Sequence, residues 1–230
     1  SEKAIYTMQE EGVDLIELGV PFSDPAADGP VIQRADERAL AQGVDIFKVF
    51  ELVRKIRNNV EVPMVFLLYY NVMVQYGIEK FFKRCQETGV DGLIIPDLPY
   101  EESDEIKEYT EKYGVYQISL VSPTSKDRIK NIAKDAKGFL YCISSLGVTG
   151  EKSSFVTNFD EFVGTIKKYT DVPACVGFGV SNGRQVKELT KYFDGAIVGS
   201  AIVKSIATGE SVEERINNLR AKIKDLKSGL

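Results

Sequence analysis

Two carboxylates early in the sequence, one at the end of an apolar run and one in the loop after it, are candidates for acid–base chemistry. Glu17 lies near the end of the apolar run 13–18, and Asp28 follows eleven positions later in a loop rich in Gly, Pro, Ser and Asp. Burying an unpaired carboxylate costs several kcal/mol, so an acid at the end of a buried strand suggests chemistry. Two carboxyl groups in different environments can donate and accept protons. The sequence therefore predicts an active site around residues 17–28.

Each of these acids also has a structural interpretation. Glu17 could form an ion pair with Arg34 or Arg38. Asp28, which precedes a glycine, could simply shape a turn, and the same holds for Asp24. For Glu17 we favour a functional role, because the active sites of parallel α/β barrels lie at the carboxyl ends of the strands.

Glycine-rich turns late in the sequence predict a site for an anion. Residues 177–181 read GFGVS and residues 195–200 read GAIVGS, each at the end of an expected strand. Barrels commonly bind phosphate through backbone N–H groups after their last two strands, and glycine lets the backbone approach the anion. The alternative is two tight strand-to-helix turns. Two such turns on neighbouring strands favour phosphate binding.

A third glycine-containing loop covers residues 144–154. Gly147 and Gly150 flank Thr149, which suggests a lid that folds over a ligand. Without the neighbouring sites, a solvated linker would be the simpler interpretation.

The composition narrows the chemistry and the partners. The 230 residues include no histidine, which excludes Ser-His and Cys-His nucleophiles and most zinc sites, so we expect no metal. The net charge of −5 argues against a nucleic-acid partner, and no apolar run reaches the roughly 18 residues of a membrane span. Cys85, Cys142 and Cys175 have no paired spacing and predict reduced core residues of a cytoplasmic protein.

Short apolar segments that alternate with helix-like stretches must position these groups. Alternation of this kind predicts a parallel sheet, and repeats of about 30 residues favour a (β/α)8 TIM barrel over an open doubly wound sheet. The expected strands are residues 13–18, 64–69, 92–96, 115–120, 138–143, 174–178 and 195–199.

Serine residues mark the expected starts of several helices. Ser103, Ser125 and Ser181 each precede an apolar stripe of helical period, which is an N-cap pattern. Ser211 and Glu214 predict a capping box at the start of the last helix.

The beginning of the sequence is unusual for a barrel. Residues 1–11 look like the second half of a helix, packing through Ile5 and Met8, and no strand precedes them. We expect a single barrel domain over residues 1–230 whose first strand, and the start of whose first helix, are absent from the sequence given.

Five motifs together resemble the α subunit of tryptophan synthase. They lie at residues 17–30, 96–102, 145–150, 177–181 and 198–203, and the resemblance runs in order through almost the whole chain. The family cleaves indole-3-glycerol phosphate to indole and glyceraldehyde 3-phosphate, without a metal or an organic cofactor in this subunit.

The resemblance also implies roles for individual residues. Glu17 matches the family's catalytic acid–base, and Asp28 matches the acid that contacts the indole N–H. The other matches are Tyr141 and Thr149 as supporting residues, Gly150, Gly179, Gly199 and Ser200 at the phosphate, Leu67, Tyr69 and Ile94 in the indole pocket, and Asp24, Asn71 and Pro99 on the partner face.

The partner implied by the resemblance is the pyridoxal-phosphate-dependent β subunit in an αββα hetero-tetramer. Alternatives are a free-standing lyase, a weakly active module that binds and activates its partner, and another sugar-phosphate barrel such as an epimerase. The pair Glu17 and Asp28 argues against a pure binding module. The absence of histidine excludes epimerases with histidine-ligated metals.

Overall fold

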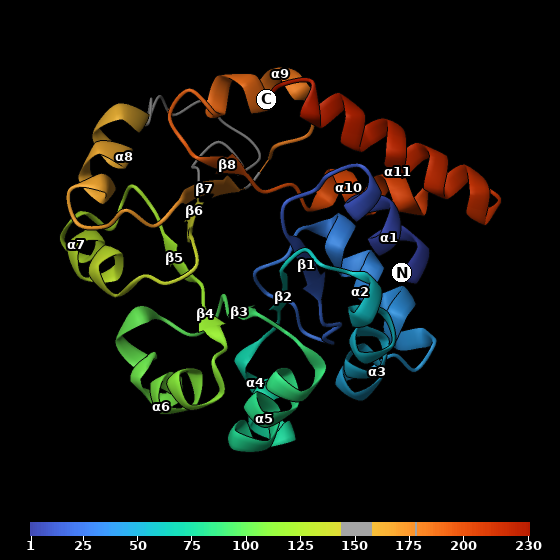
Figure 1. The fold of residues 1–230 in the computed structure, drawn as a ribbon, viewed down its shortest axis with the longest axis horizontal. Coiled ribbons are helices and arrows are strands. Elements are labelled where there is room, and N and C mark those ends of the chain that lie inside the picture. Colours follow the sequence, from blue (N-terminus) through green and yellow to red (C-terminus); the bar gives the residue numbers. More distant parts are fainter. Residues whose placement is uncertain (144–157, 178) are drawn as a thin grey trace. The chain divides into compact units, whose positions relative to one another are not determined.

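A computed structural model describes residues 1–143, 158–177 and 179–230 of the chain (Figure 1). It divides into two compact units. Unit 1 contains Ser1–Gln117 and Val203–Ile223, and unit 2 contains Ile118–Ile202 and Lys224–Leu230. The single domain expected over residues 1–230 stays a prediction.

Unit 1 contains a sheet whose strands follow chain order. The order is β1-β2-β3-β4, and each neighbouring pair is parallel. A doubly wound sheet would reverse its order at a switch point, so chain order fits barrel winding. The strands are β1 (Ile16–Gly19), β2 (Met64–Leu67), β3 (Gly92–Ile94) and β4 (Tyr116–Gln117).

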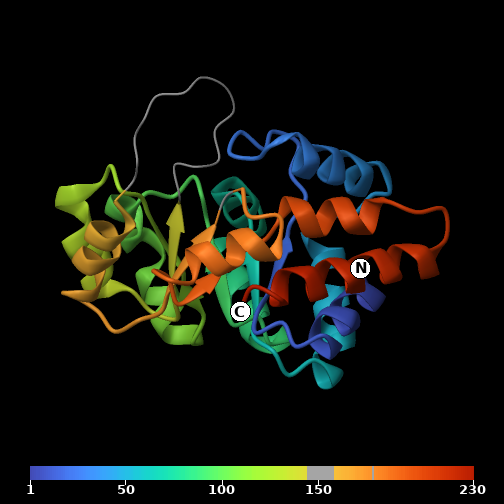
Figure 2. The same ribbon diagram turned by 90° about the horizontal axis from the view of Figure 1, so that it is seen from above.

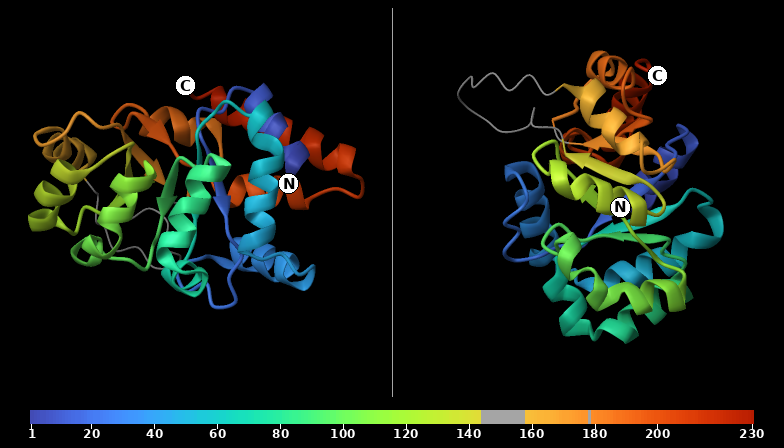
Figure 3. Two further views of the ribbon diagram at one scale, coloured as in Figure 1. Left: turned by 60° about the horizontal axis from the view of Figure 1, so that its bottom comes forward. Right: turned by 90° about the vertical axis from the view of Figure 1, so that its left-hand side faces the viewer.

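Three helices of unit 1, α3 (Ile46–Ile56), α5 (Ile78–Thr88) and α6 (Asp104–Tyr113), lie side by side (Figure 3). Their apolar faces form a core with the sheet, in which the rings of Phe50 and Phe66 lie 5.3 Å apart. The remaining elements of residues 1–117 are α1 (Glu2–Glu10), α2 (Pro30–Ala41), η1 (Arg57–Asn59), α4 (Tyr70–Tyr76) and η2 (Tyr100–Glu102).

Unit 2 repeats the arrangement with a second parallel sheet of order β5-β6-β7-β8. Its strands are β5 (Ser119–Val121), β6 (Leu140–Ile143), β7 (Ala174–Gly177) and β8 (Gly195–Ala196). Its helices include α7 (Lys126–Asp135), α8 (Phe159–Lys167) and α9 (Gly183–Leu189).

The last two helices, α10 (Ser200–Ala207) and α11 (Val212–Lys227), each contribute residues to both units. The predicted capping box of α11 is confirmed, because the N–H of Glu214 donates to Ser211 Oγ and the N–H of Ser211 donates to the Glu214 carboxylate. Leu219 and Ile223 on the predicted apolar face are buried.

Other local predictions need correction. The expected strand 115–120 is interrupted at Ile118, which lies between β4 and β5. Ser103 and Ser125 occupy N-cap positions, but neither side chain caps its helix: Ser103 Oγ bonds the Tyr100 carbonyl instead. Asn182, and not Ser181, caps α9, because its side chain accepts from the N–H of Gln185.

The three cysteines are free, as predicted. Cys85 and Cys142 are buried core residues, but Cys175, also predicted in the core, is only half-buried. Of the helices in the described ranges, none combines the length and the apolar character needed to cross a membrane.

Candidate active site

Strand alternation sets the environment of Glu17 on β1. Its neighbours Ile16 and Leu18 pack into the core beneath the helices, so the Glu17 side chain projects from the opposite face of the sheet. On β2, register places Val65 beside Glu17. Leu67 lies two residues further along β2, beside Ile94 of β3. The Glu17 side chain therefore projects from a sheet face whose neighbouring side chains are apolar.

This environment favours the neutral form of the Glu17 carboxyl. Burial, and secondarily the negative charge of Asp28, raise the pKa of Glu17 from 4.5 to about 7. In the described part of the chain, neither Arg34 nor Arg38 forms an ion pair with Glu17. The ion-pair interpretation of Glu17 is thus not supported, and a partly protonated carboxyl at neutral pH is the form required of a general acid.

The segment after β1 brings Asp28 into the same region. The chain runs from β1 to α2, which lies beyond the carboxyl end of the strand (Figure 2). The Asp28 carboxylate accepts a hydrogen bond from Tyr69 Oη at 2.8 Å, across 41 positions of sequence. Burial raises the pKa of Asp28, and the Tyr69 hydrogen bond opposes that rise. The Asp28 side chain therefore makes a long-range contact, which a residue that only shapes a turn would not need.

Asp36 on α2 is a titratable group near this pair that sequence reasoning missed. Burial, and then the charge of Asp28, raise the pKa of Asp36 to about 6. Its spacing in the sequence could have indicated it, because Asp36 lies at helical period with Ile32 and Ala39, which share its half-buried stripe on α2. Three carboxyl groups therefore interact electrostatically at this end of unit 1.

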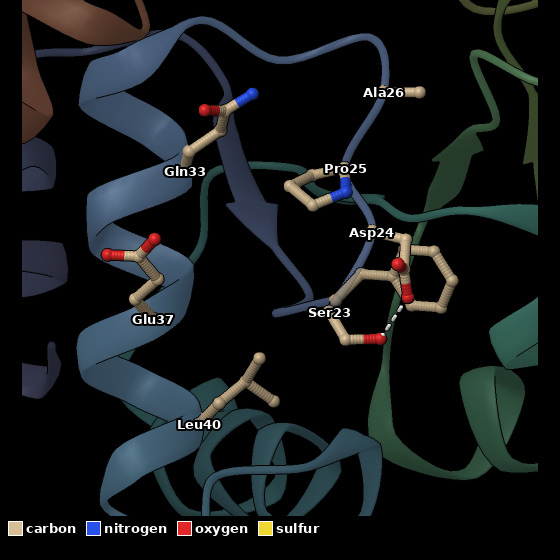
Figure 4. A pocket seen from close by; sticks show the side chains of 8 residues that line it. Ser23, Asp24, Pro25, Ala26, Gln33, Glu37 and Leu40 are labelled. Atoms are coloured by element: carbon tan, nitrogen blue, oxygen red, sulfur yellow. Dashed lines mark hydrogen bonds between the residues drawn. The ribbon is translucent and has the colours of Figure 1, made fainter.

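A hollow of about 420 Å³ lies between the loop after β1 and α2. Figure 4 shows Gln33, Glu37 and Leu40 on α2 facing the loop that carries Ser23 and Asp24, whose side chains share a hydrogen bond. Glu17 and Asp28 do not line it. The hollow therefore belongs to the outer surface of the loop and not to the carboxyl pair.

The three residues predicted for a partner face are all exposed. Asp24 lies in the loop after β1, Asn71 in the first turn of α4, and Pro99 at the start of η2. All three follow strands of unit 1. They are therefore accessible at the carboxyl ends of β1, β2 and β3.

In unit 2, the glycine that ends β7, Gly177, and the glycine that follows the strand, Gly179, have different physical roles. A Cβ atom on Gly177 would lie 2.5 Å from the Tyr141 ring, so glycine is required for Tyr141 to pack there. Gly179 has a φ of 77°, a conformation that side chains other than glycine rarely adopt. Tyr141 is thus held against the end of β7.

The turn after β8 is open. Gly199 immediately precedes α10, which begins at Ser200, and both residues are exposed. Apart from its chain neighbours, no atom of the described residues lies within 4 Å of the position that a Cβ atom on Gly199 would occupy. The start of α10 is therefore accessible to an anion.

Two predicted site residues, Thr149 and Gly150, lie outside the described residues. Among the residues that are described, no cluster of His, Cys, Asp and Glu could hold a metal ion.

Comparison with known proteins places this geometry in context. A family model described as tryptophan synthase alpha chain matches residues 1–230. The chain is 47% identical over 227 residues to the tryptophan synthase alpha chain of Alkaliphilus metalliredigens, a match that covers 97% of this chain and 85% of the relative. It is 46% identical over 226 residues to that of Thermoanaerobacter sp. strain X514, covering 98% and 86%.

Solved structures agree. Tryptophan synthase subunit alpha from Campylobacter jejuni matches with a TM-score of 0.87 and 40% identity, covering 98% of this chain and 88% of that one. A chain of tryptophan synthase from M. tuberculosis matches with a TM-score of 0.87 and 33% identity, covering 100% and 86%. These neighbours are TIM barrels, so the barrel class predicted from the sequence is confirmed.

Proposed function

The chain belongs to the tryptophan synthase alpha chain family, and on that premise we propose that Glu17 and Asp28 are the groups with which it cleaves indole-3-glycerol phosphate. The reaction is that of a carbon–carbon lyase in tryptophan biosynthesis and yields indole and glyceraldehyde 3-phosphate. One observation carries the assignment: Glu17 projects from an apolar strand face with its pKa raised to about 7, partly by Asp28.

Glu17 supplies and recovers one proton in the proposed mechanism. It protonates the indole ring carbon that bears the glycerol phosphate, which makes the ring a cation. When the carbon–carbon bond breaks, its electron pair returns to the ring, and the hydroxyl on the departing carbon loses its proton as the aldehyde forms. Glu17 takes that proton and regains its starting state. The cycle therefore balances without a cofactor.

Asp28 stabilises the cation that this protonation creates. Part of the positive charge lies on the ring nitrogen, and a carboxylate accepting the indole N–H lowers the energy of that state. Leu67, Tyr69 and Ile94 supply the apolar wall of the indole pocket in this proposal. The apolar sheet face around Glu17 supports the assignment.

The substrate phosphate binds in unit 2 in this proposal. Gly179, Gly199 and Ser200 provide backbone N–H groups, supported by the positive φ of Gly179 and the open start of α10. We assign Gly150 to the same set from the family resemblance. Tyr141 and Thr149 are proposed as supporting residues.

The partner is the β subunit of tryptophan synthase, which holds pyridoxal phosphate and joins this subunit in an αββα hetero-tetramer. We place the partner face at Asp24, Asn71 and Pro99, and their exposure supports that placement. Binding there could order the loops around the site, which is allosteric coupling in the thermodynamic sense. We also propose a cytoplasmic location, which the free cysteines support.

The test is indole release from indole-3-glycerol phosphate, with and without a β subunit, by the unchanged chain and by Glu17→Gln. We expect a loss of at least about 100-fold, the low end for a general acid–base group. Glu108→Gln, at an exposed position on α6, is the matched control, with circular dichroism to check folding.

The outcomes separate the alternatives. Equal turnover by Glu17→Gln and the unchanged chain would overturn the Glu17 assignment. Full turnover without any β subunit would favour a free-standing lyase, and no turnover by the unchanged chain even with it would favour a binding module.

A further inference from the structure

The Tyr69 hydroxyl lies between two groups of the segment that joins β1 to α2. It donates its single proton to Asp28 Oδ2 at 2.8 Å and accepts the N–H of Ala27 at 2.9 Å. Tyr69 itself follows β2. One side chain from the second strand therefore holds both the backbone and the carboxylate of the loop that follows the first.

Packing and a neighbouring carboxylate fix Tyr69. The residue is only 7% exposed, and its ring stacks on Phe22 with the centroids 5.0 Å apart. The N–H of the next residue, Tyr70, donates to both oxygens of Asp97, at 2.9 and 3.1 Å. Because Asp97 follows β3, groups after three consecutive strands together set the position of the hydroxyl.

We propose that Tyr69 is a positioning residue for the cleavage reaction, whose hydroxyl holds the Asp28 carboxylate in place while Asp97 holds the start of α4 beside it. The inference rests on the proposed role of Asp28. In the described ranges, the Tyr69 hydroxyl is the only group that hydrogen-bonds the Asp28 side chain.

The bond has two consequences for the chemistry. It occupies Oδ2, which leaves Oδ1 free to accept the indole N–H. It also favours the charged form of Asp28, against burial, which raises its pKa. The carboxyl groups that interact with Asp28 are Glu17 from β1 and Asp36 from α2, and the charge of Asp28 raises the pKa of both. Tyr69 is thus the group that keeps Asp28 both placed and charged.

The test compares Tyr69→Phe with Tyr70→Phe in the full chain with its β subunit. Both variants remove a hydroxyl bonded to a carboxylate, since Tyr70 Oη donates to Glu105 at 2.7 Å. For Tyr69→Phe we expect kcat to fall about tenfold or more with little change in KM, because the binding surface remains while the orientation of Asp28 is lost. The acidic limb of the kcat–pH profile should also move to higher pH, and Tyr70→Phe should change neither quantity.

Asp28→Asn and the double variant Tyr69→Phe/Asp28→Asn complete the experiment. If Tyr69 acts through Asp28, the double variant should be no slower than Asp28→Asn alone. Losses that multiply, or an unchanged kcat and pH profile in Tyr69→Phe when Asp28→Asn is inactive, would overturn the inference and leave the role of Asp28 intact. Full activity of Asp28→Asn would instead overturn the proposed role of Asp28, and the inference with it.

Discussion

Each unit joins the starts of two neighbouring strands through a paired aspartate, β2 and β3 in unit 1 and β7 and β8 in unit 2, but the residues at the other ends of the strands differ between the units. In unit 1, the Asp91 carboxylate, just before β3, accepts the N–H of Met64 at 2.8 Å and pairs with Arg57 at 3.0 Å. In unit 2, the Asp194 carboxylate, just before β8, accepts the N–H of Ala174 at 2.8 Å and pairs with Lys167.

The carboxyl ends of the strands differ. In unit 1, Glu17 lies within β1 and Asp28 lies in the loop after its carboxyl end, whereas unit 2 has Gly179 and Gly199 after the carboxyl ends of β7 and β8. In this fold class, the amino ends of the strands serve stability and the carboxyl ends serve function. The comparison therefore separates the groups that hold the sheet from those that are candidates for chemistry.

The largest expected loss of stability comes from removing Asp91 or Asp194, each of which accepts a strand N–H and pairs with a cation. Asp91→Ala and Asp194→Ala each leave a strand N–H without its acceptor and a cation without its carboxylate partner, so each should lower the free energy of unfolding by about 2–3 kcal/mol. Urea unfolding measures the loss, and turnover at a temperature where the variants stay folded should be unchanged. A large loss of turnover in folded Asp91→Ala would contradict the claim that residues at the amino ends of the strands serve stability and not catalysis.

Substitutions of two glycines of unit 2, Gly177 and Gly199, should have smaller effects and separate a structural role from a binding role. Gly177→Ala forces Tyr141 to move, because the new Cβ would lie 2.5 Å from its ring, and should cost about 1–2 kcal/mol of stability. Because none of the described residues crowds the Cβ position of Gly199, Gly199→Ala should leave stability unchanged, but raise KM for the phosphorylated substrate severalfold. Urea unfolding and steady-state kinetics of both variants check this. An unchanged KM in Gly199→Ala would remove Gly199 from the phosphate site.

Local pattern was enough to predict the strands and that Glu17 lies on the first of them, although β1 continues two residues beyond Glu17, to Gly19. Short apolar runs closed by glycine and proline marked seven strand positions, and the structure divides only the fourth, at Ile118. The capping box of α11 was predictable because both of its partners lie within one turn. Whether Ser181 or Asn182 caps α9 was not predictable, because both residue types cap helices and the backbone path determines which one is at the N-cap position.

Contacts between distant segments could not be read from the sequence. The bond between Tyr69 and Asp28 joins residues 41 positions apart and depends on the loop after β1 folding back over β2. The involvement of Asp36 likewise depends on where α2 lies beyond the strand end (Figure 2). Sequence spacing fixes neither position, because each depends on packing.

The central claim is that the sheet face of unit 1 keeps Glu17 partly protonated at neutral pH, and stability measured against pH tests it most directly. A folded-state pKa of about 7 against 4.5 means that the Glu17 charge destabilises the fold as the pH rises through this range, by up to about 3 kcal/mol. Glu17→Gln removes that charge. Its gain in unfolding free energy over the unchanged chain should therefore be about 2 kcal/mol larger at pH 8 than at pH 5, by urea unfolding. A gain that is the same at both pH values, or larger at pH 5, would contradict the account.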